Sequence, residues 1–344
     1  DEQSGSRKGR RSAEVALQKV LTMDILRQKR RASFLCSNDA LQCYDNIVHN
    51  IAMLSMRSRG AHPNALHSLF STLQNAEHAV MTGYGVSEPQ YGGRQRKAAG
   101  LTPIQGILQG NGMGPFVWAF ISTILIGCMH TMGYTSYLQG AMTALVIRMM
   151  GYAFVDDTDL IITSRDNSTP ASALLNRFQQ AVDCWEGVLR ASGGGLEPTK
   201  TFWYLIDHKW TGNKWEYHST LDTPGDITIL TPDGTARTTL ERVEPGEARK
   251  TLGIYIAMDG NQQQQKEYLR DKGLEFADAY RVSHGLEKND AWQGVMSTIM
   301  STFKYPAMAT TLSYDEWQEV VRPVFQAASE RRLQTLTPKL RGHP

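Results

Sequence analysis

The sequence has few cysteines, no long apolar segment and little excess charge. Its 344 residues include four cysteines without a Cys-x2-Cys spacing, which argues against a zinc cluster and against a disulfide framework and favours an intracellular location, nucleus or cytoplasm. No signal peptide is visible. The apolar segment 116–129 is shorter than the ~20 residues of a membrane-spanning helix, so we expect a buried helix there and no membrane partner.

Charge is distributed unevenly along a chain whose net charge is only +2. Residues 1–31 hold nine Lys or Arg against four Asp or Glu, and residues 331–344 hold four Lys or Arg and no acid. Basic ends around an acidic centre suit a protein that grips phosphate backbones; solvated helix faces are the alternative interpretation. The hydrophobic content of 41% is typical of a soluble globular protein.

The most informative segment is Phe154-Val155-Asp156-Asp157, which the apolar run 160–162 follows. Two apolar stretches separated by a short polar segment predict a β-hairpin with two carboxylates at its tip. Adjacent carboxylates repel, so the pair is costly unless a cation holds it. A third acid, Asp39, follows the apolar stretch 32–36. Acids from two strand ends are what a two-magnesium phosphoryl-transfer site requires; an ordinary surface turn is the alternative.

Five further stretches join this segment, and the six resemble motifs of reverse transcriptases in the order of that family. They are residues 3–12, 39–45, 106–112 with Pro115, 196–200 and 250–255. The nearest resemblance is to the non-LTR retrotransposon and group II intron type. It covers roughly residues 2–257 and continues faintly to about residue 335. Each motif alone is common, whereas six in this order are specific.

The resemblance implies an α+β right-hand polymerase fold, in which an antiparallel palm sheet packs on helices at residues 112–132 and 174–189. Its expected parts are partial fingers at 1–31 and 46–105, a palm at 32–45 and 106–257, and a truncated, helical, thumb-like or connection segment at 258–344. Because the family carries further fingers residues upstream of such a start, we expect a piece of a longer polyprotein.

The resemblance also assigns roles to the acids and to one lysine. Asp39, Asp156 and Asp157 would hold two magnesium ions, with manganese as the alternative ion and the carbonyl of Ala40 as a further ligand. Magnesium prefers oxygen ligands and keeps waters, so two or three carboxylates plus a triphosphate suffice. Lys200 would protonate the leaving pyrophosphate; a strand-edge lysine is the alternative.

Three residues would contact the incoming dNTP. Tyr44 stands at the family's sugar gate, where a ring under the 2′ carbon leaves no room for a hydroxyl and selects dNTP over NTP; a core aromatic is the alternative. Gln109 and Gly110 follow a glycine-rich loop, and glycine lets a backbone approach a nucleotide closely. A helix-capping loop without a ligand is the alternative there.

The expected macromolecular partners are an RNA template and a DNA primer, and no oligomeric state is predicted. Template contacts would go to phosphates and carry no sequence preference, while the primer would lie against the tip of a hairpin. The candidates are Arg7, Arg10, Arg94 and Arg96 for the template, and Leu252 and Gly253 for the primer.

The expected function is RNA-directed DNA synthesis by a retroelement. RNA-dependent RNA polymerase ranks lower, because that class usually has Gly-Asp-Asp and a polar sugar contact where this chain has Val155 and Tyr44. A non-catalytic palm-fold remnant that binds nucleic acid is the alternative from another class. Gly114-Pro115 departs from the Ser-Pro that is usual in the family.

Overall fold

The chain divides into two units, each built from two separate stretches of sequence. The computed structural model describes residues 2–41, 43–88, 91–101, 105–107, 111–140, 142–166, 169–283 and 288–334. Unit 1 comprises Asp1–Arg10 and Lys29–Glu244, and unit 2 comprises Arg11–Gln28 and Pro245–Pro344.

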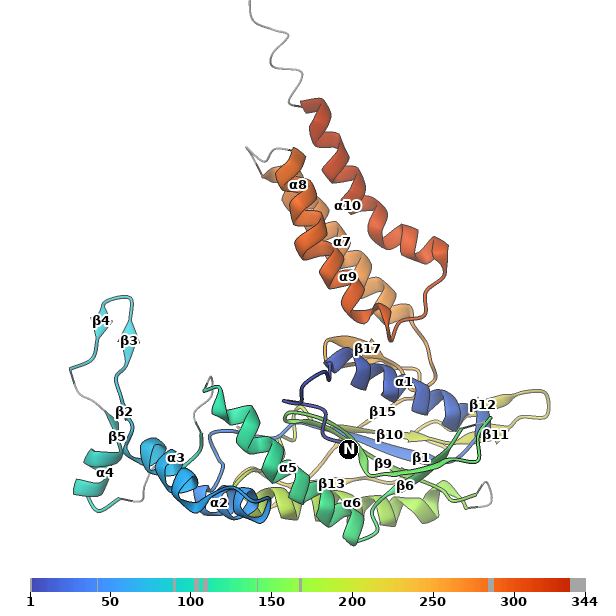
Figure 1. The fold of residues 1–344 in the computed structure, drawn as a ribbon. Coiled ribbons are helices and arrows are strands. Elements are labelled where there is room, and N and C mark those ends of the chain that lie inside the picture. The colour runs from blue at the N-terminus through green and yellow to red at the C-terminus, as the bar shows by residue number, and fades with distance from the viewer. Residues whose placement is uncertain are drawn as a thin grey trace, which may run out of the picture. The chain divides into compact units, whose positions relative to one another are not determined.

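A five-stranded mixed sheet forms the centre of unit 1 (Figure 1). In spatial order its strands are β15 (Glu241–Val243), β10 (Phe202–Ile206), β1 (Ser33–Asn38), β9 (Asp157–Thr163) and β8 (Gly151–Phe154). β10, β1, β9 and β8 pair antiparallel, as predicted. β15 instead pairs parallel to β10, so the prediction of a wholly antiparallel sheet is wrong at this edge. The long connection from β10 to β15 allows the crossover that parallel pairing requires.

Helices lie against one face of this sheet (Figure 1). α6 (Ala171–Ala191) packs on β1 and β9, and α5 (Met113–Thr131) packs on α6 and on α2 (His49–Ser58), which α3 (Pro63–Asn75) follows. The rings of Phe34 and Phe178 stack with their centroids 4.8 Å apart, and Phe34 also stacks on Trp203 at 5.8 Å. Because all three rings are buried, they tie two strands of the sheet to α6 through apolar packing.

α5 is the one described helix whose length and composition would allow it to cross a membrane, with a mean hydropathy of 1.5. Val117, Trp118, Ile121 and Leu125 on this helix are buried in the core of unit 1. This burial agrees with the expected core helix, and the absence of a membrane partner stays a prediction.

Short two-stranded ribbons lie outside the central sheet. Residues 81–86 form one of them, and α4 (Gly93–Ala98) follows. The ribbons are β2 (Glu77–His78) with β5 (Tyr91–Gly92), β3 (Met81–Thr82) with β4 (Gly85–Val86), β6 (Ser136–Gln139) with β7 (Val146–Met149), β11 (His208–Trp210) with β12 (Trp215–Tyr217), and β13 (Thr228–Leu230) with β14 (Arg237–Thr239).

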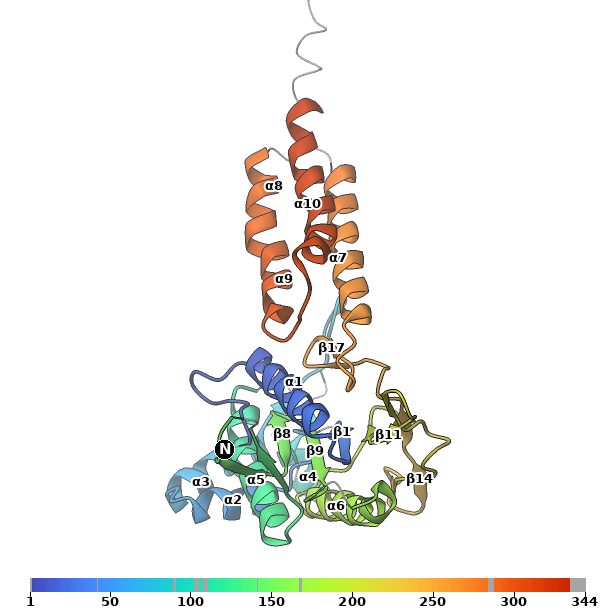
Figure 2. The same ribbon diagram turned by 90° about the vertical axis from the view of Figure 1, so that its right-hand side faces the viewer.

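Unit 2 combines a hairpin with helices. It contains α1 (Ser12–Lys29) up to Gln28, the hairpin β16 (Arg249–Thr251) and β17 (Ile254–Ile256), and the helices α7 (Gln263–Val282), α8 (Lys288–Gly294), the π-helical η1 (Val295–Ile299), α9 (Met300–Ala307) and α10 (Tyr314–Gln334). Figure 2 shows α7, α8 with α9, and α10 side by side. They share the buried residues Leu269, Ile299, Phe303 and Val320.

The division between the units differs from the predicted domain boundary at residue 257. The buried Lys19 of α1 donates a 3.0 Å hydrogen bond to the hydroxyl of Thr251 in β16. α1 and the hairpin thus contact each other within unit 2, although residues 29–244, the larger part of unit 1, separate them in the sequence. The names fingers, palm and thumb stay predictions.

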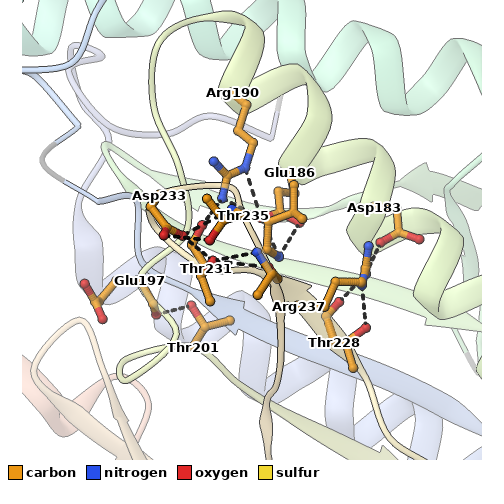
Figure 3. A network of polar contacts seen from close by, with 12 residues as sticks. Asp183, Glu186, Arg190, Glu197, Thr201, Thr228, Thr231, Asp233, Thr235 and Arg237 are labelled. Carbon is orange, nitrogen blue, oxygen red and sulfur yellow. Dashed lines mark hydrogen bonds and ion pairs between the residues drawn. The ribbon is translucent and has the colours of Figure 1, made fainter.

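A polar network attaches the β13–β14 ribbon to α6 (Figure 3). The buried carboxylate of Glu186 accepts a 3.2 Å hydrogen bond from Arg190 and a 3.0 Å hydrogen bond from the backbone N–H of Leu230. Arg237 donates to Asp183 at 2.6 Å, with both side chains more than 40% exposed (43% and 42%). Buried charge-assisted bonds contribute much more than exposed ion pairs, so Glu186 holds the ribbon more strongly than the Arg237–Asp183 pair does.

We predict that Glu186→Ala lowers the free energy of unfolding by about 1.5–3 kcal/mol, because it leaves the Leu230 N–H without its charged acceptor. The matched variant Asp183→Ala removes the exposed pair and should cost less than about 1 kcal/mol. Urea denaturation of both variants measures the difference. Equal losses would contradict the ranking of the two contacts.

Candidate functional site

A cavity of about 250 Å³ lies where β1 ends in unit 1. Three segments that are distant in sequence supply its walls. The lining residues are Asp39, Ala40, Leu41, Cys43, Tyr44, Asp45, Asp156, Glu197 and Lys200. Four of the residues predicted from sequence to act in catalysis or substrate binding therefore meet here together with Ala40: Asp39, Tyr44, Asp156 and Lys200.

The register of two strands brings the acids to this place. In the antiparallel pair of β1 and β9, Asn38 stands opposite Thr158. Asp39 follows β1 directly and Asp156 precedes β9 directly, so both residues lie at the same end of the sheet. The indole N–H of Trp185 on α6 donates to the Asn38 side-chain oxygen at 3.0 Å in a buried contact, which fixes the strand end that carries Asp39.

A backbone bridge places Lys200 beside Asp39. The N–H of Glu197 donates to the carbonyl of Asp39 at 3.0 Å, and the N–H of Leu41 donates to the carbonyl of Gly195 at 2.8 Å. The hydroxyl of Thr201 donates to the carbonyl of Glu197 at 2.7 Å (Figure 3), which closes the turn around Lys200. The ammonium of Lys200 then lies 2.9 Å from Oδ2 of Asp39.

The acidic hairpin has a strained turn. Phe154 pairs with Asp157, so Val155 and Asp156 form a two-residue loop. Val155 has φ +61°, which is an outlier for a β-branched residue and costs of order 1–3 kcal/mol. Such a conformation persists only when the surroundings hold it in place.

The side chain of Gln3 holds this turn from the start of the chain. Its Oε1 accepts from the N–H of Val155 at 3.0 Å, and its Nε2 donates to the carbonyl of Val155 at 2.9 Å. The indole N–H of Trp118 donates to the same carbonyl at 2.5 Å. A Cβ on Gly5 would lie 2.2 Å from the Val155 nitrogen, so only glycine allows this approach. We name these contacts the Gln3 clamp.

No role for the contacts of the Gln3 clamp is predicted from the sequence. The pattern Gln3-x-Gly5 was noted only as part of a fingers-like segment. One signal for these contacts is present in the sequence. Val155 is an unfavourable residue for a two-residue hairpin loop, so its backbone N–H and carbonyl need hydrogen-bond partners outside the hairpin. Cys43 and Glu197, which also line the cavity, were likewise not predicted.

Burial and neighbouring charge shift the pKa values in the cavity. Burial raises the pKa of the Asp156 carboxyl, Asp39 raises it further, and backbone hydrogen bonds and Lys200 lower it in part. The hydrogen bond to Asp39 raises the pKa of Lys200. Burial, followed by the charge of Asp156, raises the pKa of the Cys43 thiol and of the Tyr44 hydroxyl. The cavity therefore favours cations and neutral groups.

Two of the three predicted metal ligands meet in the cavity. Asp39 and Asp156 line it, while the exposed Asp157 is not among the lining residues. Within the described ranges, no group of three or more His, Cys, Asp or Glu could hold an ion. The two hydrogen bonds of the backbone bridge involve the carbonyl of Asp39 and the N–H of Leu41. The carbonyl of Ala40 takes no part in these two bonds. The two carboxylates provide the oxygen ligands that a hard cation prefers, and such a cation would have to displace the ammonium of Lys200 from Asp39.

Tyr44 forms one wall of the cavity against the start of α5. A Cβ on Gly114 would lie 3.2 Å from the Tyr44 ring, so the glycine at this position lets the ring pack closely. The carbonyl of Tyr44 accepts from the N–H of Ile107 at 2.8 Å, which attaches the predicted nucleotide-binding loop at its first turn. Gln109 and Gly110 lie outside the described residues.

The remaining predicted residues are not among those that line the cavity. Arg7 and Arg10 are exposed in unit 1, and Arg96 lies on α4. The side chain of Arg94 is outside the described part. Leu252 (φ +49°) and Gly253 (φ +84°) form the turn of the β16–β17 hairpin in unit 2, and Tyr305 donates to the carbonyl of Leu252 at 2.5 Å.

Comparison with known proteins gives a weak structural likeness. No family model and no curated protein matches the chain. A solved telomerase from Candida albicans, in complex with a TWJ fragment of telomeric RNA, has a TM-score of 0.35 and 12% identity, and the match covers 97% of this chain and 48% of that one. The corresponding telomerase structure from Candida tropicalis has a TM-score of 0.36 and 11% identity, with 92% and 50% covered. The chain spans about half the length of these structures, and a likeness this weak carries no functional conclusion.

We predict that Gln3→Ala speeds hydrogen exchange at the Val155 amide and lowers the free energy of unfolding by about 1–3 kcal/mol, because it removes the partners of a strained turn. Gln3→Glu keeps the acceptor for the Val155 N–H and loses the donor to the Val155 carbonyl, so its loss in the free energy of unfolding should be as large as half of the loss in Gln3→Ala or larger. Val155→Gly removes the strain at positive φ and should recover part of the loss in a double variant. Unchanged exchange in Gln3→Ala would show that the turn forms without the Gln3 clamp.

Proposed function

We propose that the protein is an RNA-directed DNA polymerase of a retroelement, which adds dNTPs to the 3′-hydroxyl of a primer. One observation carries the proposal. Asp39, Tyr44, Asp156 and Lys200, chosen from sequence motifs spread over 162 residues, line a single cavity at one end of the sheet. An accidental pair of acids in a surface turn would not share a cavity with the other three.

The two carboxylates supply the metal-binding part of this proposal. Asp39, Asp156 and the carbonyl of Ala40 would hold a divalent ion, and Asp157 is the third predicted ligand. When bound, magnesium would supply positive charge for the attacking and leaving oxygens of the phosphoryl group. Desolvation of Asp156 strengthens its attraction to such a cation, because charges interact more strongly in a low dielectric.

Lys200 and Tyr44 supply proton delivery and sugar selection. The hydrogen bond to Asp39 raises the pKa of Lys200, so its ammonium gives up a proton less readily while this pair is formed. Once released from Asp39, the ammonium would supply positive charge or a proton to pyrophosphate. The ring of Tyr44 lies in the wall of the cavity between Asp39 and the start of α5. A ring at this position excludes a 2′-hydroxyl by its bulk.

A second candidate is a palm-like protein that binds nucleic acid without catalysis. The Asp39–Lys200 ion pair at 2.9 Å favours it, since this pair neutralises the acid without a metal. RNA-dependent RNA polymerase stays lower, because Tyr44 opposes a 2′-hydroxyl. Primer extension by the unchanged protein on an RNA template, with magnesium and either dNTPs or NTPs and with binding of the same duplex measured separately, distinguishes the three. Extension with dNTPs supports the proposal, extension with NTPs supports the RNA polymerase, and binding without extension by either supports the remnant.

We predict that Asp156→Asn abolishes primer extension while RNA–primer binding stays within about twofold, because binding rests on basic residues elsewhere. Folding without metal raises the pKa of Asp156, so its ionised form destabilises the native state at neutral pH and this penalty falls as pH drops toward its unfolded pKa. The variant should therefore melt at or above the temperature of the parent in EDTA at pH 7. The exposed Asp45 lines the same cavity, and Asp45→Asn is the matched control that should retain extension. Near-normal extension by Asp156→Asn would overturn the assignment.

We predict that Tyr44→Val raises the ratio of ribonucleotide to deoxyribonucleotide incorporation about 10- to 100-fold, since one pocket contact shifts discrimination by ~1–3 kcal/mol. Tyr44→Phe keeps the ring and should leave the ratio unchanged. Single-nucleotide extension with each substrate measures kcat/KM for both. An unchanged ratio in a folded Tyr44→Val protein would remove Tyr44 from sugar selection.

A further inference from the structure

A second cavity of about 440 Å³ lies at the opposite end of the central sheet of unit 1. It is lined by Arg31, Tyr137, Gln139, Val146 and Arg165. Arg31 stands just before β1 and Arg165 just after β9, whereas the candidate catalytic acids stand at the other ends of these same strands. The seven residues of β9, at ~3.3 Å each, separate the two cavities by roughly 20 Å.

Two guanidinium groups lie near the ring of Tyr137, and a third contacts its backbone carbonyl. The guanidinium carbons of Arg165 and Arg148 lie 5.8 Å and 5.9 Å from the ring centroid, within the range of cation–π attraction. Arg31 donates to the backbone carbonyl of Tyr137 at 3.3 Å. Arg148 is held further by hydrogen bonds to the Thr135 hydroxyl at 2.9 Å and to a backbone carbonyl. Hydrogen bonds therefore orient Arg31, which lines the cavity, and Arg148, which lies beside Tyr137 but is not among the lining residues.

The charge of this cluster is not balanced by the protein. None of the three arginines forms an ion pair with a carboxylate of the described residues, and no acid lines the cavity. Like charges held close together repel, so the arrangement is more stable when an anion lies between them. Arginine is suited to this role, because its planar fork donates two parallel hydrogen bonds to one phosphate.

We propose that this cavity binds the phosphates of a single-stranded RNA. Nucleic acid is favoured over other anions because the cavity is also lined by the aromatic Tyr137 and by Gln139, whose Nε2 donates to the carbonyl of Thr143 at 3.3 Å and whose amide oxygen accepts no hydrogen bond from the described residues. In single-strand recognition, bases stack on aromatic rings and arginine planes and are hydrogen-bonded at their edges. The β6–β7 ribbon thus combines the two components of a single-strand site. The inference rests on the proposed function only in naming RNA as the strand.

Binding of a fluorescein-labelled 20-nucleotide single-stranded RNA to the full chain, followed by anisotropy in EDTA, tests the proposal. Arg165→Gln removes a guanidinium for which the structure gives no hydrogen bond, and should weaken binding several-fold. The Arg148→Gln/Arg165→Gln double variant should weaken it about tenfold at 100 mM salt. The slope of log affinity against log salt should fall by ~0.7 for each lost phosphate contact. Arg165→Lys keeps the charge and should recover part of the affinity.

The exposed Arg57 at the end of α2 gives a matched control, since Arg57→Gln removes the same charge from the same unit. Losses equal to those of Arg57→Gln, or none at all in variants with unchanged circular dichroism and melting, would overturn the proposal. If a poly-glutamate peptide of matched charge displaced the labelled RNA as well as unlabelled RNA does, the ligand of this cavity would be an acidic protein segment and not RNA. Because EDTA excludes extension from the assay, failed extension with arginine-dependent binding would sink the polymerase proposal alone.

Discussion

The antiparallel register of β1 against β9 is the constraint on which both cavities depend. Pairing of Asn38 with Thr158 and of Ser33 with Thr163 places acids at one end of the two strands and arginines at the other. A slip of one residue would move every side chain of these strands to the opposite face and would also separate Asp39 from the acidic hairpin. The ring stack of Phe34 with Phe178 and Trp203 opposes such a slip, because it would remove Phe34 from the core.

Opposing effects set the properties of the candidate catalytic cavity. Burial and the proximity of Asp39 disfavour the ionised form of Asp156, while backbone hydrogen bonds and Lys200 favour it, and the former are larger. The ionised carboxylate of Asp156 is therefore disfavoured by its surroundings, and a bound cation would stabilise it. Geometry adds a second constraint, because the Gln3 clamp holds Val155 at φ +61° and so determines where the next residue, Asp156, begins.

Local patterns predicted much of this structure, and long-range contacts account for what they missed. The alternation of apolar stretches and acids correctly predicted the hairpin of β8 and β9 and its approach to Asp39, because strand ends and turns have local signals. β15 lies parallel to β10 with a long connection between them, and no local pattern specifies that pairing. The Gln3 clamp joins residues 152 positions apart, and the arginines around Tyr137 come from three separate strands or loops. Such groups become visible only when the chain is folded.

The Gln3 clamp has a consequence for synthesis of the chain. Its two halves are 152 residues apart, and a ribosome adds ~5–20 residues per second. The first half therefore waits roughly 8–30 s before the segment that it holds has been made. During that interval the polar side chain of Gln3 stays in water, and the acidic turn cannot take its final form before residue 155 has been made.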